Sequence, residues 1–318
     1  MVELKIQNGS NVYLPCIEDE ITWETSRKGI PGKLEFLVVK DEIISFQEGN
    51  LVQLKVDNTK VFNGHIFTKK RSSDQIIKVT AYDQLRYLKN KDTKVFENRT
   101  ASQIVKKLAD DFQLLTGTIE DTGYVIETRV EDNKTLMDMI QSALDITMQN
   151  RNKMYVLFDD FGAISLKSID SMKLDVLIEK STAEDFDYTS SIDSNTYNLI
   201  KLAYDNDKTK KREIYEAKDS NNIAAWGLLQ YYEKVNQNTN AKAKADGLLK
   251  LYNKKTRNLS VSNAIGDIRV RGGCLIPVWL ELGDIKVQNY MLVETVKHTF
   301  KSNQHYMDIT LRGGDFVA

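Results

Sequence analysis

Three segments with apolar residues at alternate positions occur near the N-terminus and return, in the same order, near the C-terminus. Gly49-x-Leu51-Val52-x-Leu54 matches Gly273-x-Leu275-Ile276-x-Val278; Val61-Phe62-x-Gly64-x-Ile66 loosely matches Leu292-Val293-x-x-Val296; and Ile77-x-Val79-x-Ala81-x-Asp83 matches Met307-x-Ile309-x-Leu311, with Asp315 further on. Alternation of this kind is typical of half-buried antiparallel strands. Such patterns recur in any β domain, so chance similarity is the alternative, but the shared order favours a duplicated β domain.

Helical periodicity separates the two β regions. Thr100 and Gln103 have the spacing of a capping box, and the apolar residues from Ile104 to Phe112 then fall on one helical face. A second helix is predicted to begin after Asp132 or Asn133. The segment from Tyr155 to Leu166 is expected to form a strand, a turn at Asp159-Asp160-Phe161-Gly162, and a second strand. The region therefore predicts an inserted α/β domain.

A second helical insertion is expected within the C-terminal β region. Asp219 to Asn222 supplies N-cap candidates before Ile223, Trp226, Leu229 and Tyr232, and a further helical stretch runs from Ala241 to Tyr252. The aromatic residues of this part are Trp226, Tyr231, Tyr232 and Tyr252. We expect them to fill a core or an interface, with docking to another protein as the second interpretation.

Chain length and pattern together predict an α+β, mainly β, fold. A chain of 318 residues is expected to hold two or three domains. We predict an N-terminal antiparallel β domain at 1–92, an inserted α/β domain at 93–178, and a similar C-terminal antiparallel β domain at 179–318 that carries the helical insertion at about 219–256.

The charge balance argues against a dedicated nucleic-acid binder. The chain has 44 Lys and Arg residues and 45 Asp and Glu residues, for a net charge of -1, whereas such proteins carry a basic excess. Two basic runs remain, Lys69-Lys70-Arg71 and Lys208 to Arg212. They indicate either contact with an acidic partner or DNA, or solvated hairpin tips.

No segment has the pattern of a signal peptide or a membrane span. The N-terminus lacks a basic region followed by an apolar core, and no window approaches the roughly 18 apolar residues of a spanning helix. We expect synthesis and retention in the cytoplasm, without stable membrane association.

Cys16 and Cys274 do not form a disulfide framework or a zinc site, and are expected to be buried or half-buried thiols.

None of the residues that could carry chemistry forms a convincing site. His65, His298 and His305 lack zinc-binding spacing, and His298 is expected to face His305 across a hairpin as a polar pair. The adjacent acids Asp110-Asp111 and Asp159-Asp160 are expected to solvate a helix end and to begin a turn, rather than to form a glycosidase pair. Arg271-Gly272-Gly273 and Arg312-Gly313-Gly314-Asp315 indicate turns or bulges, with arginines that could bridge to a neighbouring subunit. We predict no enzyme activity, no catalytic residue, no cofactor and no metal.

Several segments together resemble a known family. They are Val61-Phe62-Asn63-Gly64, Val79 to Asn90, Thr135 to Ile140, Trp226 to Gln230 and Arg271-Gly272-Gly273. Their order is similar to that of the XkdQ/YqbQ family of Bacillus and Clostridium prophages. The closing segment, Val293 to Leu311, also resembles the late control gene D proteins of Mu-like phages.

The resemblance implies a trimeric baseplate hub with two tail-tube-like β-barrel domains. Such a hub joins the hexameric tail tube to the spike, and a duplicated domain would let three chains present six similar units. The implied partners are the tail tube protein, a spike protein formed by another polypeptide, and other baseplate or LysM-containing tail proteins. The implied location is the host cytoplasm during assembly and then the baseplate of the particle. A tail-associated cell-wall hydrolase and a type VI secretion spike-like protein remain the alternatives.

Overall fold

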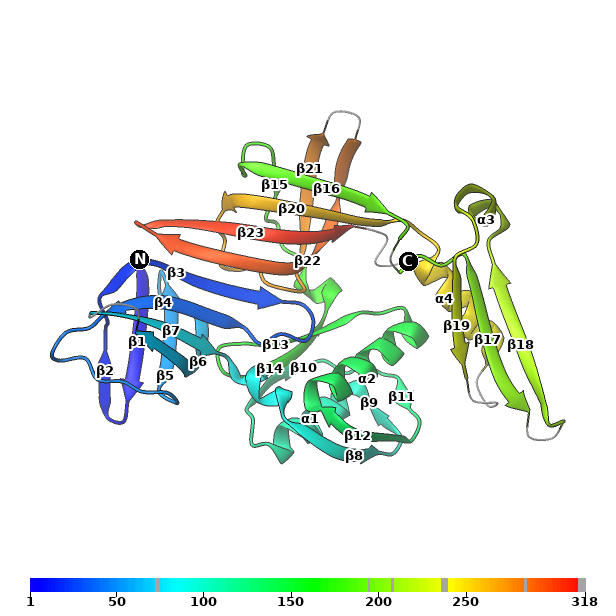
Figure 1. The fold of residues 1–318 in the computed structure, drawn as a ribbon, viewed down its shortest axis with the longest axis horizontal. Helices are drawn as coiled ribbons and strands as arrows, with labels where there is room; N and C mark the ends of the chain where they lie inside the picture. Colours follow the sequence, from blue (N-terminus) through cyan, green and yellow to red (C-terminus); the bar gives the residue numbers. More distant parts are fainter. Residues whose placement is uncertain (72–74, 194, 207–208, 236–239, 283–284, 314–318) are drawn as a thin grey trace.

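A computed structural model describes residues 1–71, 75–193, 195–206, 209–235, 240–282 and 285–313 of the chain (Figure 1). The N-terminal part contains β1 (Val2–Asn8), β2 (Asn11–Tyr13), β3 (Ile17–Ser26), β4 (Lys33–Val39), β5 (Leu51–Val56), β6 (Thr59–Arg71) and β7 (Ile76–Tyr82). The C-terminal part contains β15 (Ile178–Glu179), β16 (Asp185–Ser191), β20 (Thr256–Ile265), β21 (Leu275–Leu282), β22 (Ile285–Lys301) and β23 (Gln304–Gly313). Together these strands form the mainly β body of the molecule.

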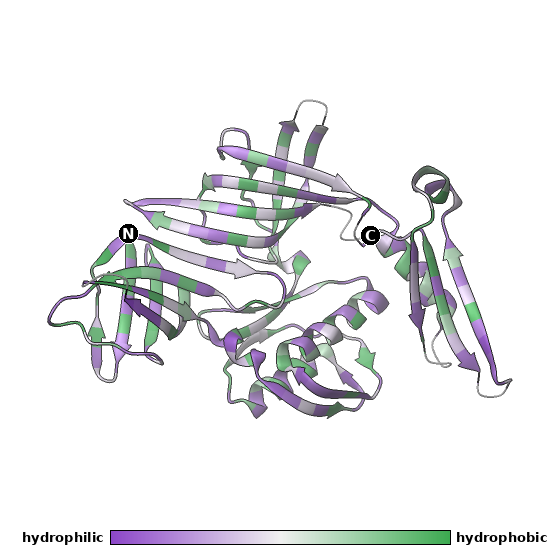
Figure 2. Ribbon diagram, in the orientation of Figure 1, coloured by the Kyte–Doolittle hydropathy of each residue, from purple (hydrophilic) through white to green (hydrophobic). Residues whose placement is uncertain are grey.

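All of these strands belong to one 13-stranded sheet. Its order is β16-β20-β23-β22-β3-β4-β7-β6-β5-β1-β2, with β21 attached to β22 and β15 to β21. The sheet passes from the C-terminal to the N-terminal part where β22 lies beside β3 (Figure 1). Apolar and polar residues alternate along the strands (Figure 2), which is the expected pattern for strands with one face toward a core.

The two parts have the same strand order. The N-terminal order is β3-β4-β7-β6-β5 and the C-terminal order is β16-β20-β23-β22-β21. If the five strands of each part are numbered by their order in the sequence, both parts have the sheet order 1-2-5-4-3. The pairing register shifts at Phe67 between β6 and β7, and at Glu294 between β22 and β23. These bulges fall at corresponding positions, because Gly49 N donates to Ile66 O just as Gly273 N donates to Val293 O.

Both of these glycines have positive φ, of 85° and 98°, which most other residues avoid. Their predicted correspondence therefore agrees with the structure. The match of the middle strand does not: Leu292-Val293 corresponds to His65-Ile66 and not to Val61-Phe62, because β21 has eight residues and β5 has six.

The predicted closed barrels are not found in the described residues. β3, the strand that begins the N-terminal order, pairs with β22 of the other part instead of closing on its own part. The halves therefore form one continuous open sheet.

The inserted part contains α1 (Ala101–Asp111) and α2 (Leu136–Arg151) as its helices. Its shorter elements are η1 (Gln84–Lys89), β8 (Lys91–Phe96), β9 (Arg99–Thr100), β10 (Thr116–Ile119), β11 (Val125–Ile126), β12 (Arg129–Thr135), β13 (Tyr155–Asp159), β14 (Ile164–Ser168) and η2 (Ile169–Met172). The predicted capping box at Thr100 and Gln103 is confirmed. The predicted start of the second helix was too early, because β12 continues through Asp132 and Asn133 to Thr135, whose hydroxyl accepts from Asp138 N.

The C-terminal insertion is not simply helical. It contains β17 (Leu199–Asn206), β18 (Lys211–Lys218), α3 (Ser220–Trp226), β19 (Gln230–Lys234) and α4 (Ala241–Tyr252). Asp219 caps α3 as predicted, but the helix stops at Gly227, so Leu229 lies beyond it and Tyr232 lies in β19, which pairs with β17. Tyr231 and Tyr252 stack at a 5.8 Å centroid distance and help to fill a small core, whereas Tyr232 is exposed.

Separate apolar clusters support these parts. One cluster fills the N-terminal strands, a second the inserted α/β part, and a third the C-terminal strands, where Val156 and Phe158 of β13 also pack. The domain boundaries at residues 92 and 178 stay a prediction. Cys274 is buried as expected, but Cys16 is exposed and lies in the short segment between β2 and β3.

Candidate functional site

The junction of β22 and β3 is the first candidate site, because it joins the duplicated halves. Thr295 pairs with Ser26, Lys297 with Glu24 and Lys301 with Glu20 in an antiparallel register. Arg27 N donates to Glu294 O at 2.8 Å, and the Arg27 side chain pairs with the Glu294 carboxylate at 2.8 Å. The junction thus combines a continuous backbone ladder with opposite charges on facing strands.

A histidine is buried at this junction. His298 stacks on Trp23 at a 4.7 Å centroid distance, its Nδ1 lies 2.9 Å from His305 Nε2, and its Nε2 lies 2.9 Å from Val270 O. The predicted His298–His305 pair across the hairpin is confirmed. Burial, with the positive charge of His305 as a second cause, lowers the pKa of His298 to about 3. The imidazole is therefore neutral at pH 7.

We expect His298→Phe to reduce the loss in the free energy of unfolding that occurs as the pH falls below about 6.5. A histidine with a pKa of about 3 in the folded state and about 6.5 in the unfolded state binds fewer protons when folded, so stability falls as the pH drops from 6.5 toward 3. At pH 5 this loss is about 2 kcal/mol. Phenylalanine keeps the ring on Trp23 and does not titrate.

Urea denaturation at pH 7.5, 6 and 5 measures the difference between the two proteins. The variant should be less stable at pH 7.5, because Val270 O loses its partner, yet lose less on acidification. Parallel slopes for His298→Phe and the parent would contradict the assignment. Asp267 and Arg271 also act on His298, and both are unchanged in this comparison.

A second site joins all three parts of the chain through buried charges. Asp83, between β7 and η1, accepts from Gly32 N at 2.8 Å and from Leu85 N at 3.0 Å. Arg271 donates through Nη2 to Asp159 O at 2.7 Å and lies over the Phe158 ring at 4.2 Å. Burial raises the pKa of Asp83 well above its usual range and also raises the pKa of Asp159. The nearby Arg271 guanidinium acts in the opposite direction and lowers the pKa of both carboxyl groups, but burial outweighs it.

Gly272, the next residue, permits the closest approach of backbone in this region. A Cβ atom at Gly272 would lie 2.3 Å from the Ser26 carbonyl carbon and 2.4 Å from Arg27 N. Gly272 N also donates to Thr25 Oγ1 at 2.9 Å. The Arg271-Gly272-Gly273 run is thus a tight turn before β21, and its arginine is used within its own chain.

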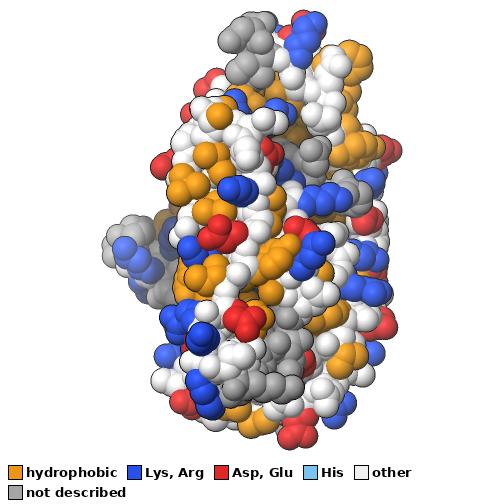
Figure 3. Space-filling model, turned by 90° about the vertical axis from the view of Figure 1, so that its right-hand side faces the viewer, with side chains coloured by type: hydrophobic (Ala, Val, Ile, Leu, Met, Phe, Trp, Pro, Cys, Tyr) orange, Lys and Arg blue, Asp and Glu red, His pale blue; other side chains and the backbone are white. Residues whose placement is uncertain are grey.

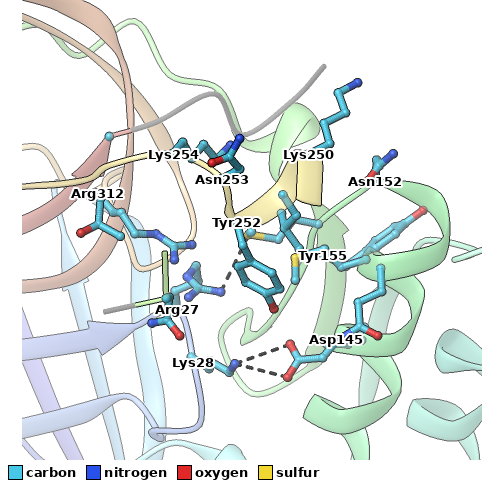
Figure 4. Close-up of a pocket in the computed structure, with 18 of the residues that line it drawn as sticks. Arg27, Lys28, Asp145, Asn152, Tyr155, Lys250, Tyr252, Asn253, Lys254 and Arg312 are labelled. Carbon is cyan, nitrogen blue, oxygen red and sulfur yellow. Dashed lines mark hydrogen bonds and ion pairs between the residues drawn. The ribbon is translucent and has the colours of Figure 1, made fainter. Parts of the chain in front are cut away.

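A cavity of about 610 Å³ opens between the inserted part, the C-terminal insertion and the end of the sheet (Figure 4). Its labelled cations are Arg27, Lys28, Lys250, Lys254 and Arg312 (Figure 4). Lys28 pairs with Asp145 of α2 at 3.3 Å, and Arg312 pairs with Glu294 at 2.8 Å. Burial raises the pKa of Tyr252 in the cavity wall. These cations would suit acidic groups, and the described residues of the lining include no serine, cysteine or histidine.

The adjacent acids lie where the sequence placed them. Asp111 ends α1 and pairs with Lys94 at 2.9 Å and Lys107 at 3.2 Å. Asp159 begins a turn, with its Oδ1 accepting from Gly162 N at 2.7 Å.

Among the described residues no group of three or more His, Cys, Asp or Glu side chains could hold a metal ion. In the same part of the chain, no helix is both long and apolar enough to cross a bilayer. The absence of enzyme activity stays a prediction.

The basic runs are placed only in part. Lys69, Lys70 and Arg71 end β6, whereas Lys208, Gly314 and Asp315 lie outside the described residues. On the face that carries the C-terminal insertion, Lys and Arg side chains are scattered among acidic and hydrophobic ones (Figure 3). Sequence reasoning found the run at β6 but missed Asp83 and Arg27, because their partners lie far away in the chain.

Comparison with known proteins defines the family. A family model described as YQBQ-like matches residues 21–312. The chain belongs to the YQBQ-like family. It is 31% identical to the uncharacterized protein YqbQ of Bacillus subtilis (strain 168), over 97% of this chain and 96% of that protein. It is 29% identical, over the same shares, to protein XkdQ of the phage-like element PBSX of that strain.

The YQBQ-like fold also occurs in a protein of solved structure. The 43 kDa tail protein of prophage MuSo2 from Shewanella oneidensis aligns with a TM-score of 0.74 and 14% identity, covering 99% of this chain and 100% of that one. The predicted resemblance to the XkdQ/YqbQ family is confirmed, and the chain shares the fold of a phage tail protein.

Proposed function

We propose that the chain is a structural hub protein in the baseplate of a contractile phage tail or tail-like particle. One observation carries the proposal: a single continuous sheet contains the same strand order twice. The relationship to XkdQ of a phage-like element and the fold shared with a prophage tail protein support it.

The duplicated order gives the proposed mechanism, which is geometric. Three copies arranged in a ring would present six similar units to a six-fold tail tube and three-fold symmetry to a spike. The proposed partners are therefore the tail tube protein, the spike protein and neighbouring baseplate or LysM-containing proteins. The hydrolase alternative gains no support from the adjacent acids, because Asp111 is held in an ion pair and Asp159 in a turn.

Native mass spectrometry of the assembled complex tests this function. The chain is co-expressed with the tail tube and spike proteins of the same prophage and purified through a tag on the spike. We expect three copies of the chain in each complex, whereas the isolated chain can remain monomeric. One or six copies for each spike trimer, or hydrolysis of purified peptidoglycan by the isolated chain, would overturn the proposal.

A further inference from the structure

The edge of β16 and the edge of β6 near its end are among the strand edges of the large sheet that have no neighbour in the described residues. β16 pairs only with β20. One edge of β6 pairs with β5 as far as His65. On the same edge, Ile66 N donates to Asn50 O and Ile66 O accepts from Gly49 N. From Phe67 to Arg71, β6 then has only β7 beside it in the part of the chain described. Unpaired edges of this kind readily accept another strand.

The corresponding edges are already joined elsewhere in the same chain. β6 corresponds to β22, and β16 corresponds to β3, by their places in the two strand orders. Beyond its bulge at Glu294, β22 pairs with β3. Beyond the corresponding bulge at Phe67, the edge of β6 is open. It lies on the far side of the N-terminal strands from β16, so the two edges are far apart along the sheet order of one chain.

We propose that the end of β6 in one copy pairs antiparallel with β16 of a second copy. Transfer of the β22–β3 register through the matching bulges and strand pairs gives the partners Thr68 with Ser191, Lys69 with Ser190, Lys70 with Thr189, and Arg71 with Tyr188. The inference rests on the proposed function and identifies the surface that would close its ring. The occupant is a second copy of this chain, because each open edge corresponds to one side of the junction that the chain already makes.

The side chains on the two edges complement each other. At the existing junction Lys297 faces Glu24 and His298 stacks on Trp23. In the transferred register Lys70 lies diagonally from Asp187, within reach of a cross-strand pair. Arg71 takes the place of His298 opposite Tyr188, where a guanidinium can stack on the aromatic ring.

Net charge supports the same pairing. β6 ends in Lys69, Lys70 and Arg71, whereas β16 carries Asp185 and Asp187, which are exposed. Lys69 is already held over the Phe46 ring at 4.5 Å, so Lys70 and Arg71 are the cations available to the second copy. The basic run is thereby explained as an edge for an acidic strand.

Disulfide trapping in the assembled complex tests the pairing. Lys70→Cys and Thr189→Cys are introduced into a Cys16→Ser chain, which is then co-assembled with the tube and spike proteins. We expect non-reducing gels to show covalent dimers and trimers that reducing agent dissolves. The register control, Lys70→Cys with Asp187→Cys, should crosslink at least about tenfold less, because the Cα atoms are then too far apart.

A matched pair within the chain controls for reactivity and separates the possible failures. Lys297→Cys with Glu24→Cys occupies the corresponding positions of the existing junction and should form an intramolecular disulfide. If the complexes contain three copies and form this control disulfide but no crosslink between positions 70 and 189, the proposed strand pairing is wrong and the proposed function still stands. Complexes without three copies would overturn the proposed function. Equal crosslinking by the register control would overturn the register.

Discussion

Replacing Arg271 with alanine should reduce the free energy of unfolding by about 3–5 kcal/mol, the usual cost of removing one partner from a buried charge group. The guanidinium lies between the N-terminal, inserted and C-terminal parts, over Phe158 and against Asp159. Its loss removes the hydrogen bond to Asp159 O and the cation that opposes the burial of the Asp83 and Asp159 carboxyl groups. Urea denaturation monitored by circular dichroism at pH 7.5 measures the change.

Arg269 provides the matched control for this substitution. It stands two positions earlier in the same loop and pairs with Asp175 at 2.9 Å and Asp267 at 2.7 Å, but its side chain is 54% exposed. An exposed ion pair contributes about 1 kcal/mol or less, so Arg269→Ala should be nearly silent. If the two alanine variants lost similar stability, the buried charge cluster would not be what holds the three parts together.

Local patterns predicted the parts of the structure that depend on neighbours in sequence. The capping box at Thr100, the turn at Asp159 and the His298–His305 pair each involve residues within one helix end or hairpin. The repetition of β segments was also visible, because the alternation that follows Gly49 returns after Gly273. These features need only short-range information.

The features that the sequence could not predict depend on contacts between distant segments. Nothing near Arg271 indicates that Asp83 and Asp159 will share its environment. β3 pairs with β22, so one open sheet replaces the expected barrels. The alternation of apolar residues shows which face of a strand is buried, but it does not show which other strand lies beside it. The strand at Gln230–Lys234 was missed because its aromatic residues also fit a helical face.

The junction that joins the halves leads to the last prediction, that Gly272→Ala weakens the fold severely. The added Cβ would meet backbone atoms of Ser26 and Arg27 at 2.3 and 2.4 Å, and neither can move without separating β3 from β22. We expect a loss of about 3 kcal/mol, the upper end of the usual range for overpacked sites. In the N-terminal half, Glu48 occupies the position that corresponds to Gly272. No strand of the described chain lies against Glu48 as β3 lies against Gly272.

Gly247→Ala is the control, because Gly247 lies within α4 and its Cβ would meet only Gln149 O at 3.8 Å. Alanine should stabilise that helix by about 0.5–1 kcal/mol. Thermal unfolding of both variants measures the contrast. If Gly272→Ala does not fold, Thr25→Val supplies the second measurement: it removes only the acceptor for Gly272 N and should cost about 1–3 kcal/mol. A soluble Gly272→Ala chain with the stability of the parent would show that β3 and β22 do not meet as closely as the register requires.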